Sequence, residues 1–384
     1  MDLIKNALVA GVAAAALAGA SVASAAVIGG GATLSQPLFE DLVVYNPSYG
    51  WDYAGTGSGT GKKAFFGNDA THFNAVRQQN GLPPYAAGTA VKYAGSDSVV
   101  SEAEALDFAT DLEPTVGKLI QVPLAATSVT VPFNVPGLSS LNLTSAQLVS
   151  IFKGEITNWN QLDSSYPDLA LKVVYRTGGS GTTEIFVRHL KAVDSVKFPD
   201  VTNDFQSTID PSNPVFVQAT GSGGVAGSVQ ATPGAIGYVS PDPAYIDVND
   251  ASQVAALQNP NDGQFYLPTE VNVIMTVESV EPPEGTDRLQ AINWGKTFAN
   301  PTAGYSIAGF TFLLANECYA DPSEASSIRA FFQDHYTGTH DADISAHALI
   351  PLAANWNSAV MATYINSGAP AEINGAGCST KAGR

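Results

Sequence analysis

The segment from Val173 to Phe186 constrains the fold more than any other part of the sequence. It reads Val-Val-Tyr-Arg-Thr-Gly-Gly-Ser-Gly-Thr-Thr-Glu-Ile-Phe, which is typical of a buried strand, a glycine turn and a helix start. Glycines let a ligand approach the backbone, and a helix start offers free N–H groups and positive partial charge. Arg176 adds a planar fork of donors, and the hydroxyls of Ser180 and Thr182 follow. The pattern predicts an anion site, although a capped helix beside a surface arginine would show the same letters.

Three earlier segments repeat this arrangement at residues 27–39, 51–63 and 91–104. Each has a short apolar strand that is followed by residues of the kind that bind ligands. These are a glycine turn and a helix start in the first segment, a glycine loop in the second and a carboxylate in the third. Open α/β sheets place ligand residues at the carboxyl ends of their strands. The repetition therefore predicts an α/β fold. The candidate residues from these segments are Thr33, Leu34, Ser58 and Asp97.

Two glycine-rich stretches resemble nucleotide-binding motifs, and we favour neither as one. The loop at 55–63 has Thr56 and Lys63 where the Walker pattern needs glycine and a hydroxyl residue. Residues 221–226 match a loose Gly-x-Gly-x-x-Ala pattern, with Asp242 near the expected acidic position. The helix before Pro233 would be short, and small loops after strands match this pattern often. No nucleotide cofactor is expected.

The charge balance restricts the partners. Lysine and arginine number 17 against 35 acidic residues, which gives a formal net charge of -18. Nucleic acid and anionic membrane surfaces are poor partners for such a chain. A bound anion would be held by local dipoles and hydrogen bonds, since the overall field opposes it. Hydrophobic residues make up 45% of the chain, which is enough for a sizeable core.

The first 25 residues predict a secretory signal peptide. Lys5 gives a basic start, an apolar run follows from Ala7 to Ala20, and Ala23-Ser24-Ala25 is a small-residue cleavage site. No later stretch is long enough to span a bilayer, and no cysteine follows the cleavage site as a lipid anchor. We therefore expect a periplasmic or secreted product that begins at Ala26.

Cysteine and histidine offer two further possibilities. Cys318 and Cys378 are the two cysteines, and in an exported protein one disulfide explains them more simply than a metal site. His335, His340 and His347 lie in one segment with two aspartates. That segment lacks the HExxH spacing, so we favour a solvated loop over a metal site.

Five groups of residues, in order along the chain, resemble the DING proteins, phosphate-binding relatives of the periplasmic component of the phosphate ABC importer. These groups are Gly29-Gly30-Gly31-Ala32-Thr33-Leu34, Ala94-Gly95-Ser96-Asp97-Ser98, Leu119-Ile120-Gln121-Val122-Pro123, Tyr175-Arg176 with Ser180-Gly181-Thr182-Thr183-Glu184, and Pro351-Leu352 with Asn355-Trp356. The resemblance implies a two-lobed periplasmic-binding-protein fold of type II, the Venus-flytrap arrangement. The expected organisation is lobe I over 26–122, lobe II over 123–305 and a return to lobe I over 306–384.

The resemblance also implies a ligand and its contacts. The two lobes would close on inorganic phosphate, and Asp97 would accept a hydrogen bond from the proton of phosphate. The implied donors are Thr33, Leu34, Ser58, Arg176, Ser180, Gly181 and Thr182. One departure concerns Gly178, which stands where relatives commonly carry an acidic residue between the arginine and the Ser-Gly-Thr. A carboxylate there could orient the arginine.

These observations predict a monomeric, non-enzymatic solute-binding protein, without a cofactor or a metal, that captures phosphate for uptake or scavenging. An ABC phosphate permease is a candidate partner. An exported phosphomonoesterase is the main alternative, because a phosphate cradle is also half of such an active site. The sequence has no Gly-x-Ser-x-Gly nucleophile elbow around Ser58 or Ser180. A secreted surface or adhesion protein is a further alternative.

Overall fold

The computed structural model describes residues 27–384, so the predicted signal peptide over 1–25 lies outside the described residues. The strands are β1 (Ile28–Gly31), β2 (Asp52–Gly55), β3 (Tyr93–Ser96), β4 (Leu119–Ser128), β5 (Phe133–Asn134), β6 (Asn142–Leu143), β7 (Lys172–Arg176), β8 (Phe216–Ala219), β9 (Ala235–Gly237), β10 (Ala256–Gln258), β11 (Phe265–Tyr266) and β12 (Ala308–Asn316). The helices are α1 (Gln36–Phe39), α2 (Ser58–Gly67), α3 (Asn74–Gln79), α4 (Glu102–Asp111), α5 (Glu113–Val116), α6 (Ser145–Phe152), α7 (Gly181–Val193), α8 (Gly221–Ala231), α9 (Glu270–Val277), α10 (Ala291–Trp294), α11 (Pro322–Tyr336), α12 (Asp341–Ala346) and α13 (Ala354–Val360). Tighter or wider turns extend or join them at Glu40–Val44, Ala70–Phe73, Trp159–Gln161, Phe205–Thr208, Gly285–Leu289, Met361–Ile365 and Ala376–Cys378.

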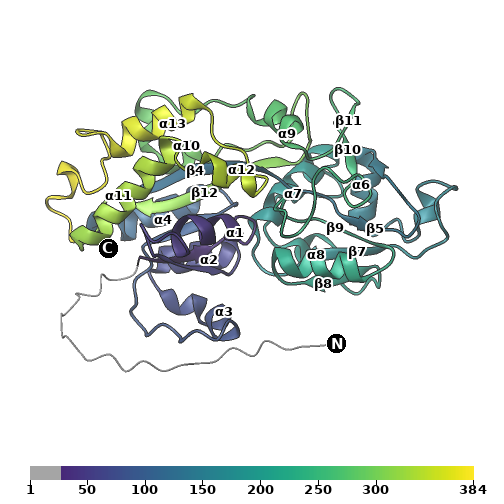
Figure 1. The fold of residues 1–384 in the computed structure, drawn as a ribbon, viewed down its shortest axis with the longest axis horizontal. Helices are drawn as coiled ribbons and strands as arrows, with labels where there is room; N and C mark the ends of the chain where they lie inside the picture. Colours follow the sequence, from purple (N-terminus) through teal and green to yellow (C-terminus); the bar gives the residue numbers. More distant parts are fainter. Residues whose placement is uncertain (1–26) are drawn as a thin grey trace, which may run out of the picture.

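Two main sheets divide the molecule into the two lobes seen in Figure 1. Lobe I contains the sheet β2-β1-β3-β12-β4, in which β1 runs parallel to β2 and β3. Lobe II contains the sheet β5-β9-β7-β8, in which β7 runs parallel to β8 and β9. A small third sheet has the order β11-β10-β6. The predicted α/β class follows directly from the strand, turn and helix repeats.

The longest strands, β4 and β12, form an antiparallel pair in lobe I, and every one of their residues is buried. Their largely apolar sequences suit strands that are covered on both faces. Directly beyond this pair the chain passes between the lobes, and the Val129 N–H donates to the Ile307 carbonyl at 2.9 Å. The chain therefore returns to lobe I through β12 after it has built lobe II. The exact lobe boundaries at 122/123 and 305/306 stay a prediction. Strand β4 crosses the first of these boundaries and remains paired with β12 through Ser128.

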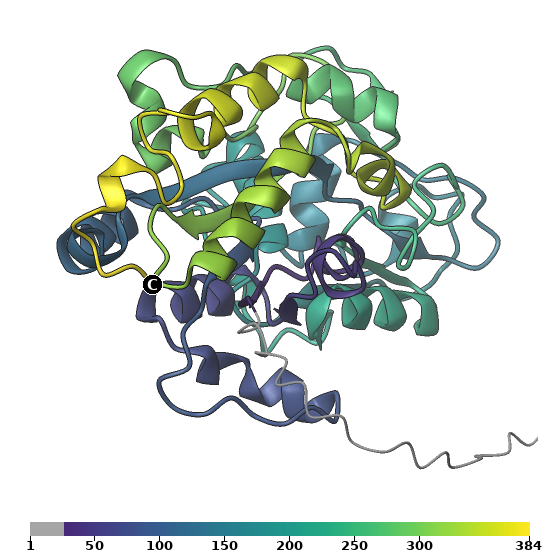
Figure 2. The ribbon, with the colours of Figure 1, turned by 60° about the vertical axis from the view of Figure 1, so that its left-hand side comes forward.

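The C-terminal segment packs on lobe I. Figure 1 shows α10, α11 and α13 in the same half of the molecule as α1, α2 and α4, and in Figure 2 α11 runs above the purple and blue first segments. Arg384 donates from Nη1 to the carbonyls of Phe65 and Val91 at 2.8 and 2.9 Å. The predicted disulfide between Cys318 and Cys378 is confirmed, with Cα atoms 5.5 Å apart. It ties this tail to the end of β12.

Reduction of the disulfide is expected to lower the melting temperature and to leave ligand affinity nearly unchanged. A bridge across 60 residues stabilises by roughly 2–4 kcal/mol, mainly because it restricts the unfolded chain. Melting temperatures with and without reductant, each paired with a calorimetric titration, test this. An unchanged melting temperature would show that the bond adds nothing, and a large loss of affinity would show that the tail shapes the binding cleft.

The glycine stretch at 55–63, predicted as a loop, instead begins helix α2 at Ser58, so that prediction is wrong. Gly57 has a φ of 90°, which completes the turn before the helix. A Cβ at Gly61 would lie 2.4 Å from Gly31 Cα, and one at Gly59 would lie 2.9 Å from Gly179 Cα. These glycines let α2 pack directly on neighbouring backbone, and that tertiary packing outweighs their low helix propensity.

Candidate anion-binding site

Three helix starts, α2 from lobe I and α7 and α8 from lobe II, lie at the seam between the lobes. Each follows the carboxyl end of a parallel strand, β2, β7 or β8. Their first backbone N–H groups have no partner inside their own helix, and their dipoles point positive ends toward the seam. The arrangement is suited to an anion held between the lobes.

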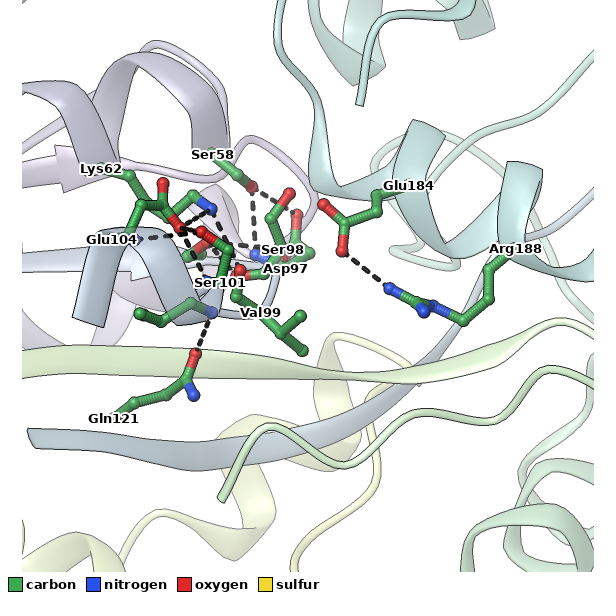
Figure 3. Close-up of polar contacts among 12 residues, drawn as sticks. Ser58, Lys62, Asp97, Ser98, Val99, Ser101, Glu104, Gln121, Glu184 and Arg188 are labelled. Atoms are coloured by element: carbon green, nitrogen blue, oxygen red, sulfur yellow. Dashed lines mark hydrogen bonds and ion pairs between the residues drawn. The ribbon is translucent and has the colours of Figure 1, made fainter. Parts of the chain in front are cut away.

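Ser58 and Asp97 form the lobe I side of this site. Ser58 opens α2, and Asp97 directly follows β3. The Ser58 hydroxyl donates to Asp97 Oδ2 at 3.3 Å and accepts from the Asp97 backbone N–H at 3.0 Å (Figure 3). Both residues are buried, and Asp97 Oδ1 has no hydrogen-bond partner among the described residues. A buried carboxylate oxygen without a partner is costly, so it is a natural acceptor for a protonated ligand.

Burial raises the pKa of Asp97 to about 7, against the smaller lowering effects of neighbouring hydroxyls and Arg176. Its carboxyl group is therefore ionised above about pH 7 and protonated below it. In the ionised state it accepts hydrogen bonds, and in the protonated state it can also donate one.

Arg176 is the last residue of β7 and is only 5% exposed. Its Nη1 donates to Thr33 Oγ1 at 2.8 Å across the seam, whereas its Nε has no partner among the described residues. Burial lowers the pKa of Arg176, although an arginine remains protonated at any physiological pH. The site thus contains a fixed positive charge with unused donor capacity.

The remaining predicted residues line the same seam. Ser180 is the N-cap of α7, and its hydroxyl accepts from the Thr183 N–H at 3.3 Å. Gly181 and Thr182 form the first turn of α7 and are buried. Leu34 is buried in lobe I, and its carbonyl accepts from the Ser240 hydroxyl of lobe II at 2.8 Å. All eight predicted ligand residues lie at the seam, and their role in binding stays a prediction.

The two lobes touch through backbone at the centre of the site. The Gly59 N–H at the start of α2 donates to the Gly179 carbonyl at 3.1 Å. Nearby, a Cβ added at Gly181 would lie 2.5 Å from Asp97 Cβ and from the Ser98 nitrogen. Glycine is required here because the start of α7 meets the end of β3 without room for a side chain.

Beside Asp97, the first turns of α7 carry an ion pair rather than a free charge. Arg188 Nη2 donates to Glu184 Oε1 at 2.9 Å, and Figure 3 shows this pair on α7 opposite Ser58 and Asp97. Lys62 of α2 donates to Glu104 at 3.0 Å in the same view. These charges are paired within each lobe, whereas Arg176 at the centre of the site forms no ion pair with any of residues 27–384.

Comparisons with known proteins agree with this geometry. A family model described as a PBP superfamily domain matches residues 18–340. A protein named alkaline phosphatase L from Pseudomonas aeruginosa is 40% identical over 361 residues, which cover 91% of this chain and 92% of the relative. A solved DING protein matches with a TM-score of 0.80 and 32% identity, over 93% of this chain and 99% of its own. This chain is a DING protein of the PBP superfamily.

A further DING relative with a solved structure is a high-affinity periplasmic phosphate-binding protein with phosphate bound at pH 8.5. It matches with a TM-score of 0.82 and 35% identity, over 94% of this chain and 99% of its own. The predicted family and the two-lobed fold of the DING proteins are therefore confirmed.

The sequence reasoning missed two hydroxyl residues at the site of this DING protein. Ser222, in the first turn of α8, lies with its Oγ 3.3 Å from Thr33 Oγ1. Tyr238 accepts from the Arg176 backbone N–H at 3.2 Å and lies 2.8 Å from Thr183 Oγ1. Ser222 belongs to the glycine-rich stretch that resembles a dinucleotide motif. Its position directly after a strand was the sequence signal that could have indicated a place at the site.

The prediction of a solvated loop around the histidines is wrong for His335 and His340. Both are 3% exposed, with their Nδ1 atoms 3.3 Å apart, and His335 Nε2 lies 2.7 Å from the Leu124 carbonyl. Burial lowers the pKa of His335 to about 3, so it is neutral at physiological pH. The helix α11 continues through Tyr336, which places His335 on its buried face. Residues 27–384 contain no group of three or more potential metal-ligating side chains.

His347 makes a further polar contact across the seam. Its Nδ1 lies 2.7 Å from Asp242 of lobe II, and its Nε2 lies 3.0 Å from Asp41 of lobe I. The hydrogen bond to Asp242 is the main cause that raises the pKa of His347, despite partial burial.

In the part of the chain that the structure describes, no helix has the length and apolar character needed to cross a membrane.

Proposed function

We propose that this DING protein is an extracytoplasmic solute-binding protein that captures inorganic phosphate between its lobes. The observation that carries the proposal is the placement of Arg176 and the unpartnered Oδ1 of Asp97 beside the starts of α2 and α7. Arginine offers paired donors to a tetrahedral oxyanion, and the carboxylate accepts from a ligand that keeps a proton. We place the protein in the periplasm or outside the cell, as a monomer. Its phosphate would pass to an ABC permease or be scavenged.

A second candidate function is hydrolysis of phosphate monoesters. It is favoured by the relative named alkaline phosphatase L and by the contact between the Ser58 hydroxyl and Asp97, a carboxylate whose pKa is about 7. A hydroxyl beside a base is an arrangement that nucleophilic catalysis can use. We favour binding over turnover, because the start of α7 lies so close to Asp97 and Ser98 that even one carbon added at Gly181 would clash, which leaves little space there for the alcohol part of an ester.

Titration calorimetry of ligand-stripped protein with phosphate, sulfate and a phosphate monoester tests the proposal, together with an assay for turnover of a chromogenic phosphate ester. Tight binding of phosphate without turnover is expected. Sustained release of the chromophore would support the phosphatase instead. Failure to bind any of the three anions would contradict both functions and leave the surface or adhesion role.

Selectivity for phosphate over sulfate is expected to depend on Asp97 and on pH. Phosphate keeps at least one proton at neutral pH and sulfate has none, so an ionised Asp97 accepts from phosphate and repels sulfate. Below about pH 7 the protonated carboxyl group can donate to sulfate. The phosphate preference of the wild type should therefore increase between about pH 6 and about pH 8.

Asp97→Asn removes this titration and is expected to lower the phosphate-to-sulfate preference about tenfold, because one charge-assisted hydrogen bond is lost. Its preference should also vary less with pH than that of the wild type, because only phosphate itself then titrates in this range. Paired titrations of both proteins with both anions at constant ionic strength provide the measurement. If the variant keeps the preference and pH profile of the wild type, Asp97 is structural and selectivity has another source.

A further inference from the structure

Arg176 is held in place by a hydroxyl rather than by a carboxylate. None of the ion pairs found within residues 27–384 includes Arg176, although its side chain is buried. The contact that fixes its Nη1 is the one to Thr33 Oγ1 at 2.8 Å. The direction of the guanidinium therefore depends on where the Thr33 hydroxyl stands.

The Thr33 hydroxyl has a second polar neighbour. Ser222 Oγ lies 3.3 Å from Thr33 Oγ1, and Ser222 is 3% exposed in the first turn of α8. Arginine can only donate hydrogen bonds, so Thr33 Oγ1 must accept from Arg176. That leaves the Thr33 oxygen one more lone pair and one proton. If Ser222 donates to the lone pair, the Thr33 proton is free for a ligand.

We propose that Ser222 is a positioning residue of the anion site, whose hydroxyl donates to Thr33 Oγ1 and so directs the Thr33 proton and Arg176 toward the bound anion. This inference rests on the proposed function and deepens it. Ser222 does this without a negative charge, whereas a carboxylate in its place would orient the arginine and repel the anion. Located in α8, it also links lobe II to Thr33 of lobe I when the lobes are closed.

A double-mutant cycle in phosphate calorimetry tests this role in the full mature protein. Ser222→Ala is expected to weaken phosphate binding about threefold to tenfold, the value of one neutral hydrogen bond. Ser222→Thr, which keeps the hydroxyl, should restore most of the affinity. In a Thr33→Val background, Ser222→Ala should cause little further loss, because the acceptor is already gone.

Ser228→Ala is the matched control, since Ser228 lies on the same helix with no hydrogen bond to Thr33. It should leave phosphate affinity unchanged. Additive losses in the cycle, or an unchanged dissociation constant in Ser222→Ala, would overturn the positioning role. If the wild type itself fails to bind phosphate, the proposed function fails. Melting curves of each variant confirm that they fold, and a Ser222→Ala loss that Thr does not rescue would also overturn the proposal.

Discussion

Replacing Gly181 with alanine is expected to weaken phosphate binding about a hundredfold without harming the fold. The added Cβ would lie 2.5 Å from atoms of Asp97 and Ser98 on the opposite lobe, a distance that real Cβ contacts do not reach. Overpacking of this kind costs about 1–3 kcal/mol, and here that cost falls on the closed state alone. Gly181 does not have a positive φ, so alanine fits its backbone and restricts the unfolded chain, which stabilises by about 0.4–1 kcal/mol. Stability of the open protein should therefore rise slightly while affinity falls.

Calorimetry measures the affinity, and small-angle scattering with and without phosphate measures closure as a decrease in the radius of gyration. Gly227→Ala is the matched control, because Gly227 also lies in a seam-facing helix of lobe II and a Cβ there would meet no atom within 4 Å. It should keep the affinity of the wild type. A Gly181→Ala variant with unchanged affinity would mean that phosphate binds without the close approach of α7 to β3.

Arg176→Lys is expected to lower phosphate affinity by about a hundredfold although the charge is kept. Arg176 is buried and uses one nitrogen for Thr33, so its remaining donors are available to an anion at the same time. An ammonium group cannot reach both partners, and two charge-assisted hydrogen bonds are together worth about 3 kcal/mol or more. Calorimetric titration with phosphate gives the dissociation constant.

Arg288→Lys is the control for replacing an arginine with a lysine. Arg288 lies in the Gly285–Leu289 turn rather than at the seam, and its Nε donates to the Pro283 carbonyl. That variant should bind phosphate as the wild type does. Equal affinities for the wild type and Arg176→Lys would remove Arg176 from the site, whatever its burial.

Local patterns in the sequence predict much of this structure for a physical reason. The strand that ends at Arg176, the turn after it and the helix start at Gly181 are determined by neighbouring residues, so the local sequence is enough to predict them. The cap of α4 at Ser101 is likewise local, since Glu104 completes a capping box with it. These elements needed no knowledge of distant contacts.

The errors all concern contacts between distant segments. Ser58 opens a helix because Gly61 packs against Gly31, which no window around Ser58 contains. The burial of His335 depends on the Leu124 carbonyl, far away in the sequence. Ser222 was set aside because its motif suggested a nucleotide, whereas its partner Thr33 lies 189 positions earlier. The sequence pattern indicates the chemical role that a residue can have, and tertiary packing determines which residue it contacts.

The hydrogen bond from the Gly59 N–H to the Gly179 carbonyl has an evolutionary consequence. The lobes meet there through main-chain atoms, so the contact does not depend on the chemistry of any side chain. Anion recognition, by contrast, depends on exchangeable side chains such as Ser58, Asp97 and Ser222. If the proposed function holds, a descendant of this protein can change the anion that it recognises through those side chains and still inherit the same contact between the lobes, provided that the seam glycines are retained.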